Sequence, residues 1–578
     1  MATAHGVGEG AEKLGVIAVA LLAAVVVLSG SAAGAPAGGL PRVSQRTRAM
    51  ALLAALVLTP VLLAVDVWHT TQLEHLRAHP AEAAAAVVLG LAAVFALALL
   101  VHRRPQAFAL LAVAALPFRL PISTGGSQSN LLLPLYLVVG AGSLAYLVPR
   151  LFGGRGLDTA AEPPPLRREP SALDEPNGVR PMESRGQVGP RAWLVRALTP
   201  RGVEWLLMAV VVLYALQAAY SADFSKALEN MVFFYVPFAL LFALLREVRW
   251  TRELLLACLA TAVALAVAFA GIGFVEYYRK HLFLNPKVVA ANEYSNFFRV
   301  NSLFFDPNIY GRFLALVMIA VTTGVLWGAR RREVLGGGAV LLWLLGGLVT
   351  SFSQSSIAAL LLGLAVLAAW RWDLRGTLYT AGALAAIAAV VVLVAPPSLH
   401  LGLSGKGGSA SNATSGRTKL IEGGLRLFAD RPLQGFGPGS FAQEYRSHEH
   451  VGSTNATSAS HTIPITIAAE QGIVGLVLYV ALLVSAFAVL FTGAGRAPPR
   501  LKPGDTRLRL ESPFQPALAA CFAALVLHTF TYADFLEDPL TWTLLGIGVS
   551  LAAKGRFAVA APTSREAPSG MPAASHQA

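Results

Sequence analysis

Charge and cysteine are both scarce in this 578-residue chain, and each scarcity excludes a class of protein. Only 13% of the residues are charged, against 55% that are hydrophobic, and the mean hydropathy is +0.60. Soluble globular proteins carry about 25% charged residues, so the composition indicates a polytopic membrane protein. The two cysteines, Cys258 and Cys521, stand in or beside apolar runs, which supports neither a disulfide framework nor a thiolate metal site.

Sequence signatures of nucleotide, metal and repeat proteins are missing as well. No Walker-type phosphate loop, H-E-x-x-H pair or dinucleotide fingerprint stands out, which counts against an ATP-driven pump or a membrane metalloprotease. The period-2 alternation of an outer-membrane barrel is absent, and no internal repeat of the kind found in many transporters is visible. We therefore expect helices in the membrane, with no metal site and no cofactor.

Long apolar runs are abundant and predict the fold class. About 20 helical residues cross a hydrocarbon core of roughly 30 Å, so these runs predict an all-α, polytopic transmembrane helical bundle of about 12–15 spans. The runs lie near 14–34, 50–66, 83–101, 106–122, 130–149, 203–220, 229–245, 254–274, 308–328, 334–350, 354–370, 377–395, 464–491, 515–532 and 538–553.

The net charge of +13 is compatible with a nucleic-acid partner, but its distribution favours a membrane explanation. Lys and Arg form short clusters between apolar runs, on alternate connections, as the positive-inside rule requires. We therefore expect no nucleic-acid partner. The less basic connections, including 275–307 and 396–463, are then predicted to lie on the outer face.

Hydrophilic stretches divide the chain into predicted domains. A loop of about 68 residues between spans is far longer than usual, and the aromatic and apolar content of 417–445 favours a folded, functional loop. The predicted parts are N-terminal transmembrane helices (1–149), a disordered Pro/Arg-rich cytoplasmic linker (150–202), a transmembrane core (203–395) with the outer loop 275–307, a large, partly helical extracytoplasmic loop (396–463), C-terminal transmembrane helices (464–556) and a disordered tail (557–578).

Three short motifs follow one another in the two predicted outer loops and the helices next to them. They are Arg299 to Asn308 at a helix entrance, Gly416-Arg417 followed by Pro432-Leu-Gln-Gly435-Phe-Gly437, and His461 followed by Glu470-x-Gly472-x-x-Gly475. Each motif is degenerate alone. As an ordered set over roughly 220–550, they resemble the O-antigen ligase and polymerase superfamily of bacterial membrane glycosyltransferases.

The resemblance implies an enzyme of the bacterial cytoplasmic (inner) membrane with an extracytoplasmic active site. Members of that family take a glycan from undecaprenyl diphosphate and transfer it to an acceptor hydroxyl without nucleotide or metal. The implied partners are a lipid-linked glycan donor, a glycan, lipid or protein acceptor, and membrane lipids. Ligase and polymerase both stay open, as does a multi-helix transporter or flippase, although arginines and a histidine gathered at one face favour surface chemistry.

The candidate site residues have the chemistry that such a reaction needs. Guanidinium groups pair with phosphate oxygens, so Arg299 and Arg417 are the predicted ligands of the donor diphosphate. An imidazole with a reference pKa of about 6.5 can accept the acceptor proton, which makes His461 the predicted catalytic residue. Direct attack by the acceptor hydroxyl inverts the anomeric carbon. The alternative is that these side chains anchor the helices at the lipid headgroups.

Arg426, Glu470 and Asn308 are possible supporting residues. Glu470 lies about 13 Å along a helix from His461, so we interpret it as a buried polar contact, with a substrate role as the alternative. Asp306-Pro307-Asn308 is typical of a helix start. Gly472 and Gly475 are predicted to permit close helix packing.

Overall fold

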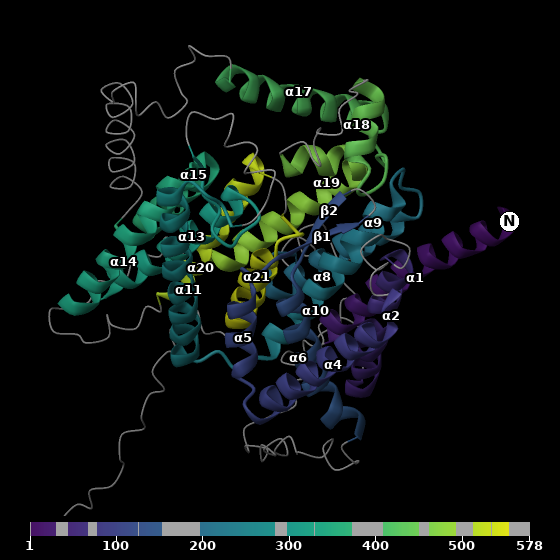
Figure 1. Ribbon diagram of the computed structural model, residues 1–578, viewed down its shortest axis with the longest axis horizontal. Coiled ribbons are helices and arrows are strands. Elements are labelled where there is room, and N and C mark those ends of the chain that lie inside the picture. The colour runs from purple at the N-terminus through teal and green to yellow at the C-terminus, as the bar shows by residue number, and fades with distance from the viewer. Residues whose placement is uncertain are drawn as a thin grey trace, which may run out of the picture.

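The fold is a helical bundle, shown as a ribbon in Figure 1. The computed structural model describes residues 2–29, 44–67, 78–124, 127–152, 197–283, 298–328, 330–372, 409–449, 462–492, 513–532 and 535–553. In this part of the chain, ten helices are long and apolar enough to cross a membrane, and α20 (Phe514–Thr531) and α21 (Pro539–Ala553) are shorter apolar helices. The predicted fold class, a polytopic helical bundle, is confirmed.

The N-terminal third contains five helices and one hairpin among its described residues. In chain order these are α1 (Ala2–Ser29), α2 (Gln45–Val67), α4 (Pro80–Arg103), α5 (Ala107–Ala115), β1 (Leu120–Thr124), β2 (Ser127–Leu131) and α6 (Leu133–Phe152). Residues 153–196, most of the predicted linker, lie outside the described residues, as do the predicted span at 377–395 and the predicted tail from 557.

The remaining elements form the central and C-terminal parts. They are α8 (Pro200–Ala218), α9 (Phe224–Asn230), the π-helix η2 (Met231–Tyr235), α10 (Val236–Glu247), α11 (Arg252–Arg279), α13 (Pro307–Trp327), α14 (Arg331–Thr350), α15 (Gln354–Arg371), α17 (Ser409–Asp430), α18 (Phe441–Glu449), α19 (Ile463–Leu490), α20 and α21. Helices α17 and α18 lie across one end of the bundle (Figure 1), which we call the loop end. They are the helices of the predicted partly helical loop.

The predicted span at 106–122 is wrong. Residues 107–115 form the nine-residue helix α5, which is about 13 Å long and too short to cross a membrane. Pro117 and Pro121 follow, and each lacks the backbone N–H that a continuing helix needs. The chain instead forms an antiparallel hairpin in which Leu120 pairs with Leu131 and Thr124 with Ser127.

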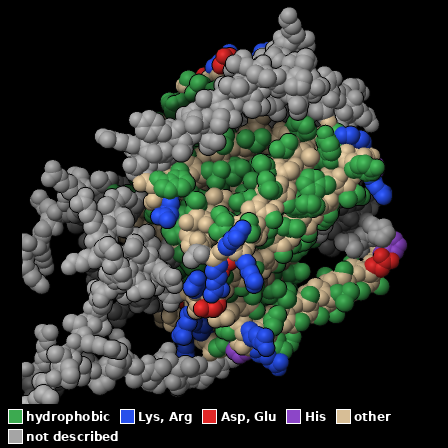
Figure 2. Space-filling view, turned by 90° about the vertical axis from the view of Figure 1, so that its left-hand side faces the viewer, with side chains coloured by type: hydrophobic (Ala, Val, Ile, Leu, Met, Phe, Trp, Pro, Cys, Tyr) green, Lys and Arg blue, Asp and Glu red, His purple; other side chains and the backbone are tan. Residues whose placement is uncertain are grey.

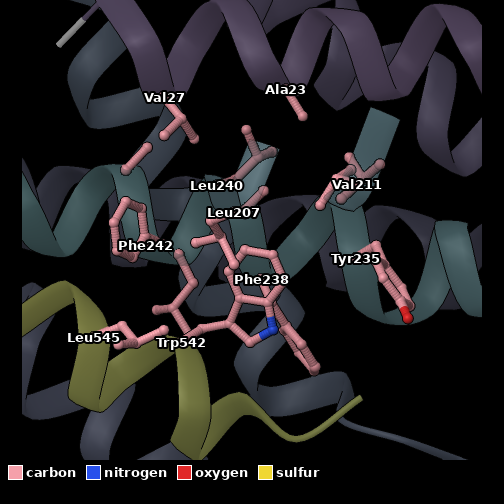
Figure 3. Packing of buried hydrophobic residues seen from close by; sticks show 14 of the residues in the cluster. Ala23, Val27, Leu207, Val211, Tyr235, Phe238, Leu240, Phe242, Trp542 and Leu545 are labelled. Atoms are coloured by element: carbon pink, nitrogen blue, oxygen red, sulfur yellow. The ribbon is translucent and has the colours of Figure 1, made fainter. Parts of the chain in front are cut away.

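The main hydrophobic core joins the N-terminal helices to the rest of the bundle. Figure 3 shows Val27 of α1 packed near Phe242 of α10 and Leu207 of α8, with Trp542 of α21 beside Phe238. A second core forms between α11, α13, α14, α15 and α20. On the face of the bundle shown in Figure 2, hydrophobic side chains predominate and Lys and Arg side chains gather in a few groups, as a lipid-facing surface requires.

Two arginines with largely buried side chains hold the end of the bundle opposite to the loop end. Arg48 of α2 contacts Glu247 of α10 at 2.8 Å and donates from Nε to the Val26 carbonyl of α1 at 2.9 Å. Arg246 of α10 contacts Glu204 of α8 at 2.8 Å and donates to the Val27 carbonyl at 2.9 Å. The two arginines therefore tie the last turn of α1 into the core.

Candidate functional site

Arg299 is held at the entrance of α13, where the sequence analysis places a helix start. Asp306 is the N-cap residue, and its side chain accepts a hydrogen bond from the Asn308 backbone N–H at 2.6 Å. The half-buried Arg299 donates from Nε to the Ser351 carbonyl at 3.2 Å and from Nη2 to Asn308 Oδ1 at 3.3 Å. The structure thus brings together two predicted site residues, Arg299 and Asn308.

Behind Asn308, a buried polar network connects α13, α15 and α20. Ser353 Oγ donates to Asn308 Oδ1 at 2.9 Å and lies 2.7 Å from Ser356 Oγ. His528 Nε2 lies 3.2 Å from Ser355 Oγ and 3.3 Å from Ser356 Oγ. Sequence reasoning missed this network. A run of serines between two apolar stretches and a lone histidine inside an apolar helix were the signals that could have found it.

The backbone that carries Arg299 is fixed by a buried carboxylate. Glu276 lies near the end of α11 and is fully buried. Its Oε2 accepts from the Ser302 N–H at 2.7 Å, and its Oε1 accepts from the Phe283 N–H at 3.1 Å. The Val300 N–H also donates to the Thr350 carbonyl at 3.2 Å. Charge-assisted contacts of this kind hold the main chain close to Arg299 in one position.

A second buried cluster of charges lies further along α13. Arg312, one turn beyond Asn308, pairs with Asp538, and Arg119 Nη2 lies 4.0 Å from the other carboxylate oxygen. All three side chains are buried. Asp538 also accepts from the Leu540 N–H at 2.9 Å, at the start of α21. The cluster therefore links α13 to α21 and to the segment that precedes β1.

The turn after α17 is joined backbone to backbone with α19, which is broken at Gly472. The Phe436 N–H donates to the Ala469 carbonyl at 3.1 Å, and the Ile473 N–H donates to the Pro432 carbonyl at 2.8 Å. Gly472 has φ 66°, and a Cβ there would lie 2.4 Å from the Leu433 carbonyl oxygen. Gly472 therefore permits a helix break and close approach of the loop, which corrects the prediction of helix-on-helix packing. A Cβ at Gly475 would meet the side chain of Gln471 of its own helix.

Three further contacts tie the same turn to the bundle. Glu470 is buried and accepts from the Phe441 N–H at 3.1 Å, at the start of α18, which agrees with its interpretation as a buried polar contact. Tyr220, just after α8, donates its hydroxyl proton to the Gln434 carbonyl at 2.7 Å. Partial burial raises the pKa of Tyr220, so its phenol keeps this proton at neutral pH. Ser221 donates to the Pro438 carbonyl at 2.7 Å.

The other two predicted arginines lie on α17. Arg417 stands in the first half of this helix, before the residues whose side chains the structure describes. Arg426 is exposed, and its Nε lies 3.1 Å from Glu449 Oε1 of α18. Arg426 therefore links the two loop helices.

His461 lies outside the described residues, but its neighbour in the chain is placed. Thr462 is the N-cap residue of α19 and donates from Oγ1 to the Phe530 carbonyl of α20 at 3.3 Å. Phe530 is two residues from His528, which reaches the network behind Asn308. The entrance of α19 and the entrance of α13 therefore meet α20 at the same end of the bundle.

Part of the chain is similar to a known protein family. A family model described as O-antigen ligase matches residues 339–480. The matched segment begins within α14 and ends within α19, so it contains Arg417, Arg426, His461 and Glu470, whereas Arg299 and Asn308 precede it. A search of curated proteins finds no match. The ten apolar helices indicate a multi-pass membrane protein, and its segment 339–480 is similar to the O-antigen ligase family.

Proposed function

We propose that the protein is a metal-independent, inverting glycosyltransferase that moves a glycan from an undecaprenyl-diphosphate-linked donor to an acceptor hydroxyl. The reaction takes place on the outer face of the bacterial cytoplasmic membrane. The observation that carries this proposal is that the entrance of α13, next to Arg299, and the entrance of α19, inside the matched segment, both meet α20 at one end of the bundle. That end also holds the large loop with α17 and α18.

The donor diphosphate is bound by Arg299 and Arg417. A guanidinium group stays charged at any working pH and can meet two phosphate oxygens at once. Two of the contacts that orient Arg299 are to an amide oxygen and a carbonyl oxygen, which are neutral acceptors. The same two arginines stabilise the negative charge that grows on the lipid diphosphate as it leaves.

His461 accepts the proton of the acceptor hydroxyl. The hydroxyl oxygen forms a bond to the anomeric carbon while the bond from that carbon to the diphosphate oxygen breaks. The electron pair of the broken bond goes to undecaprenyl diphosphate, and the proton goes to the imidazole. Because the attack comes from the face opposite to the leaving group, the configuration of the anomeric carbon is inverted.

The remaining predicted residues support this reaction without touching the reacting atoms. Asn308 orients Arg299. Glu470 fixes the start of α18 close to the entrance of α19. Arg426 keeps α17 and α18 together through Glu449, so it acts on the loop that carries Arg417.

The test is transfer of a radiolabelled glycan from synthetic undecaprenyl diphosphate by the purified protein in liposomes, without nucleotide or metal. Wild type is compared with His461→Ala, Arg417→Ala and Arg299→Ala. Arg330→Ala is the matched control, because Arg330 is exposed and pairs with Glu333 at the start of α14, away from the loop end. We expect product from wild type and Arg330→Ala, and a loss of at least about 100-fold in the other three.

Other outcomes separate the alternatives. A product that lengthens by whole repeat units identifies a polymerase, and a single transfer identifies a ligase. Wild-type protein that forms no product with any acceptor, but moves labelled lipid or solute across the bilayer, is a transporter or flippase, and the proposal is then wrong.

A further inference from the structure

The orientation of Arg299 depends on more than its direct contacts with Ser351 and Asn308. We propose that Ser353, Ser356 and His528 form a positioning network that holds Asn308, and through it Arg299, in the orientation that binds the donor diphosphate. This inference rests on the proposed function and extends it to Ser356 and His528, which lie 172 positions apart in the chain.

The first step of the argument concerns the Asn308 amide. Its Oδ1 accepts from Arg299 Nη2 at 3.3 Å and from Ser353 Oγ at 2.9 Å. A carboxamide can rotate by 180° and exchange its oxygen for an NH₂ group. The amide would then present donors to the guanidinium group of Arg299, which has only donors itself. The proton of Ser353 prevents this rotation because it requires the oxygen.

The second step follows the hydroxyl protons. Ser353 gives its single proton to Asn308 Oδ1, so its oxygen can only accept in the 2.7 Å contact with Ser356 Oγ. The proton of Ser356 is then directed to Ser353 Oγ and to the Asn308 carbonyl, which is 3.2 Å away. In the 3.3 Å contact with His528 Nε2, Ser356 Oγ is then the acceptor, and Nε2 also lies 3.2 Å from Ser355 Oγ. This assigns a proton to Nε2 of His528, which donates at the far end of the network.

The third step is the environment of the network. Ser353, Ser356 and His528 are fully buried, so water does not compete for these hydrogen bonds. Ser353 is also the N-cap residue of α15 and accepts from the Ser356 N–H. Gly311 of α13 makes room for the serines, since a Cβ there would lie 2.8 Å from Ser356 Oγ. The helices α13, α15 and α20 are thus packed closely around one ordered chain of donors and acceptors.

A double-mutant cycle separates a positioning role from a structural one. The rate of transfer is measured over a range of donor concentrations for Ser353→Ala and for His528→Leu, each in the wild-type and the Arg299→Ala background. The network is disrupted at two different residues, so that if one variant does not fold, the other still gives a result. Thr323→Ala is the matched control, because the buried Thr323 hydroxyl of α13 bonds only to the Ile319 carbonyl of its own helix among the hydrogen bonds of the described residues.

We expect each variant to lower kcat/KM for the donor by about tenfold in the wild-type background, the size of one lost hydrogen bond to a charged group. The KM for the acceptor should not change. In the Arg299→Ala background the same substitutions should change transfer by less than about twofold, because the residue through which they act is gone. Ser353→Thr and His528→Gln keep a hydroxyl and an N–H donor, and both should restore transfer to within about threefold of wild type.

Equal losses in both backgrounds would overturn the inference, as would wild-type transfer in Ser353→Ala and His528→Leu. The same cycle on equilibrium binding of labelled undecaprenyl diphosphate to the detergent-solubilised protein needs no acceptor. The binding measurement therefore tests the network even if wild-type protein transfers no glycan. In that case the proposed function would be wrong, but the network could still be shown to position Arg299. Wild-type protein that also fails to bind the lipid diphosphate contradicts both.

Discussion

Arginines at the two ends of the bundle have different partners. At the end opposite to the loop end, Arg48 and Arg246 are each paired with a glutamate at 2.8 Å. At the loop end, neutral oxygens of Ser351 and Asn308 orient Arg299. A carboxylate partner cancels the charge of a guanidinium group, whereas a neutral acceptor orients it and keeps the charge available for an anion. The first arrangement holds helices together, and the second is suited to binding phosphate.

Arginines paired with a carboxylate occur at the loop end as well. Arg312 pairs with Asp538 and is fully buried, on the same helix as Asn308. The contrast therefore does not follow from the end of the bundle at which an arginine lies. It follows from the partner, and the partner can be changed by substitution.

Arg246→Ala should have the largest effect on stability. It leaves the buried carboxylate of Glu204 without its partner, and breaking a buried pair costs about 3–5 kcal/mol. We expect a lower unfolding midpoint in detergent, measured by thermal unfolding. The double variant Arg246→Leu with Glu204→Leu should recover much of the loss, because it removes both charges. An unchanged midpoint in Arg246→Ala would show that this pair does not hold α8 to α10.

Arg299→Lys should have the opposite profile, with a large effect on transfer and little on folding. Lysine keeps the charge but loses the planar fork and its bond geometry to Asn308, at a cost of about 2–3 kcal/mol in the transition state. We expect a fall of about 30- to 100-fold in kcat/KM for the donor. The control is Arg330→Lys, measured in the same liposome assay. Wild-type kinetics in Arg299→Lys would remove Arg299 from the site.

Gly472→Ala should loosen the loop end. The new Cβ would stand 2.4 Å from the Leu433 carbonyl oxygen, in a residue with φ 66°, and we expect a cost of about 2 kcal/mol. The readout is limited proteolysis between α17 and α18 together with transfer activity. Gly324→Ala in α13 is the matched control, since nothing lies within 4 Å of its Cβ position. Equal protease resistance in the two variants would contradict the conclusion that α19 holds the turn after α17 in place.

Arg426→Ala should have the smallest effect. Its ion pair with Glu449 is largely exposed, and exposed pairs contribute about 0–1 kcal/mol. Transfer should fall by less than about threefold, as in Arg446→Ala, which removes an exposed arginine of α18. A loss as large as that of Arg299→Lys would mean that Arg426 meets the substrate directly.

Local signals in the sequence predicted the parts of the fold that local physics controls. Apolar runs predicted the membrane bundle, and Asp306-Pro307-Asn308 predicted the start of α13. The run at 106–122 misled the prediction because apolar content outweighed the two prolines that end α5. The role of Gly472 was also misread, since its neighbour is the backbone of a turn about 40 residues earlier in the chain.

The site could be predicted only in part for a similar reason. Arg299 and Asn308 are nine residues apart, and their motif pointed to one place. Ser356 and His528 are 172 residues apart, and only the packing of α15 against α20 brings them together. Glu276 and Ser302 likewise meet only after α11 and α13 have packed. Long-range contacts of polar groups have no periodic signal in the sequence.

The most direct test of the account is the balance of products from wild-type protein in liposomes. A radiolabelled glycan on undecaprenyl diphosphate is supplied with lipid, oligosaccharide and peptide acceptors in turn, without nucleotide or metal, and both products are measured. The account predicts equal amounts of glycosylated acceptor and free undecaprenyl diphosphate, with inverted anomeric configuration. Donor recovered intact with every acceptor, or glycan released to water alone, would contradict it.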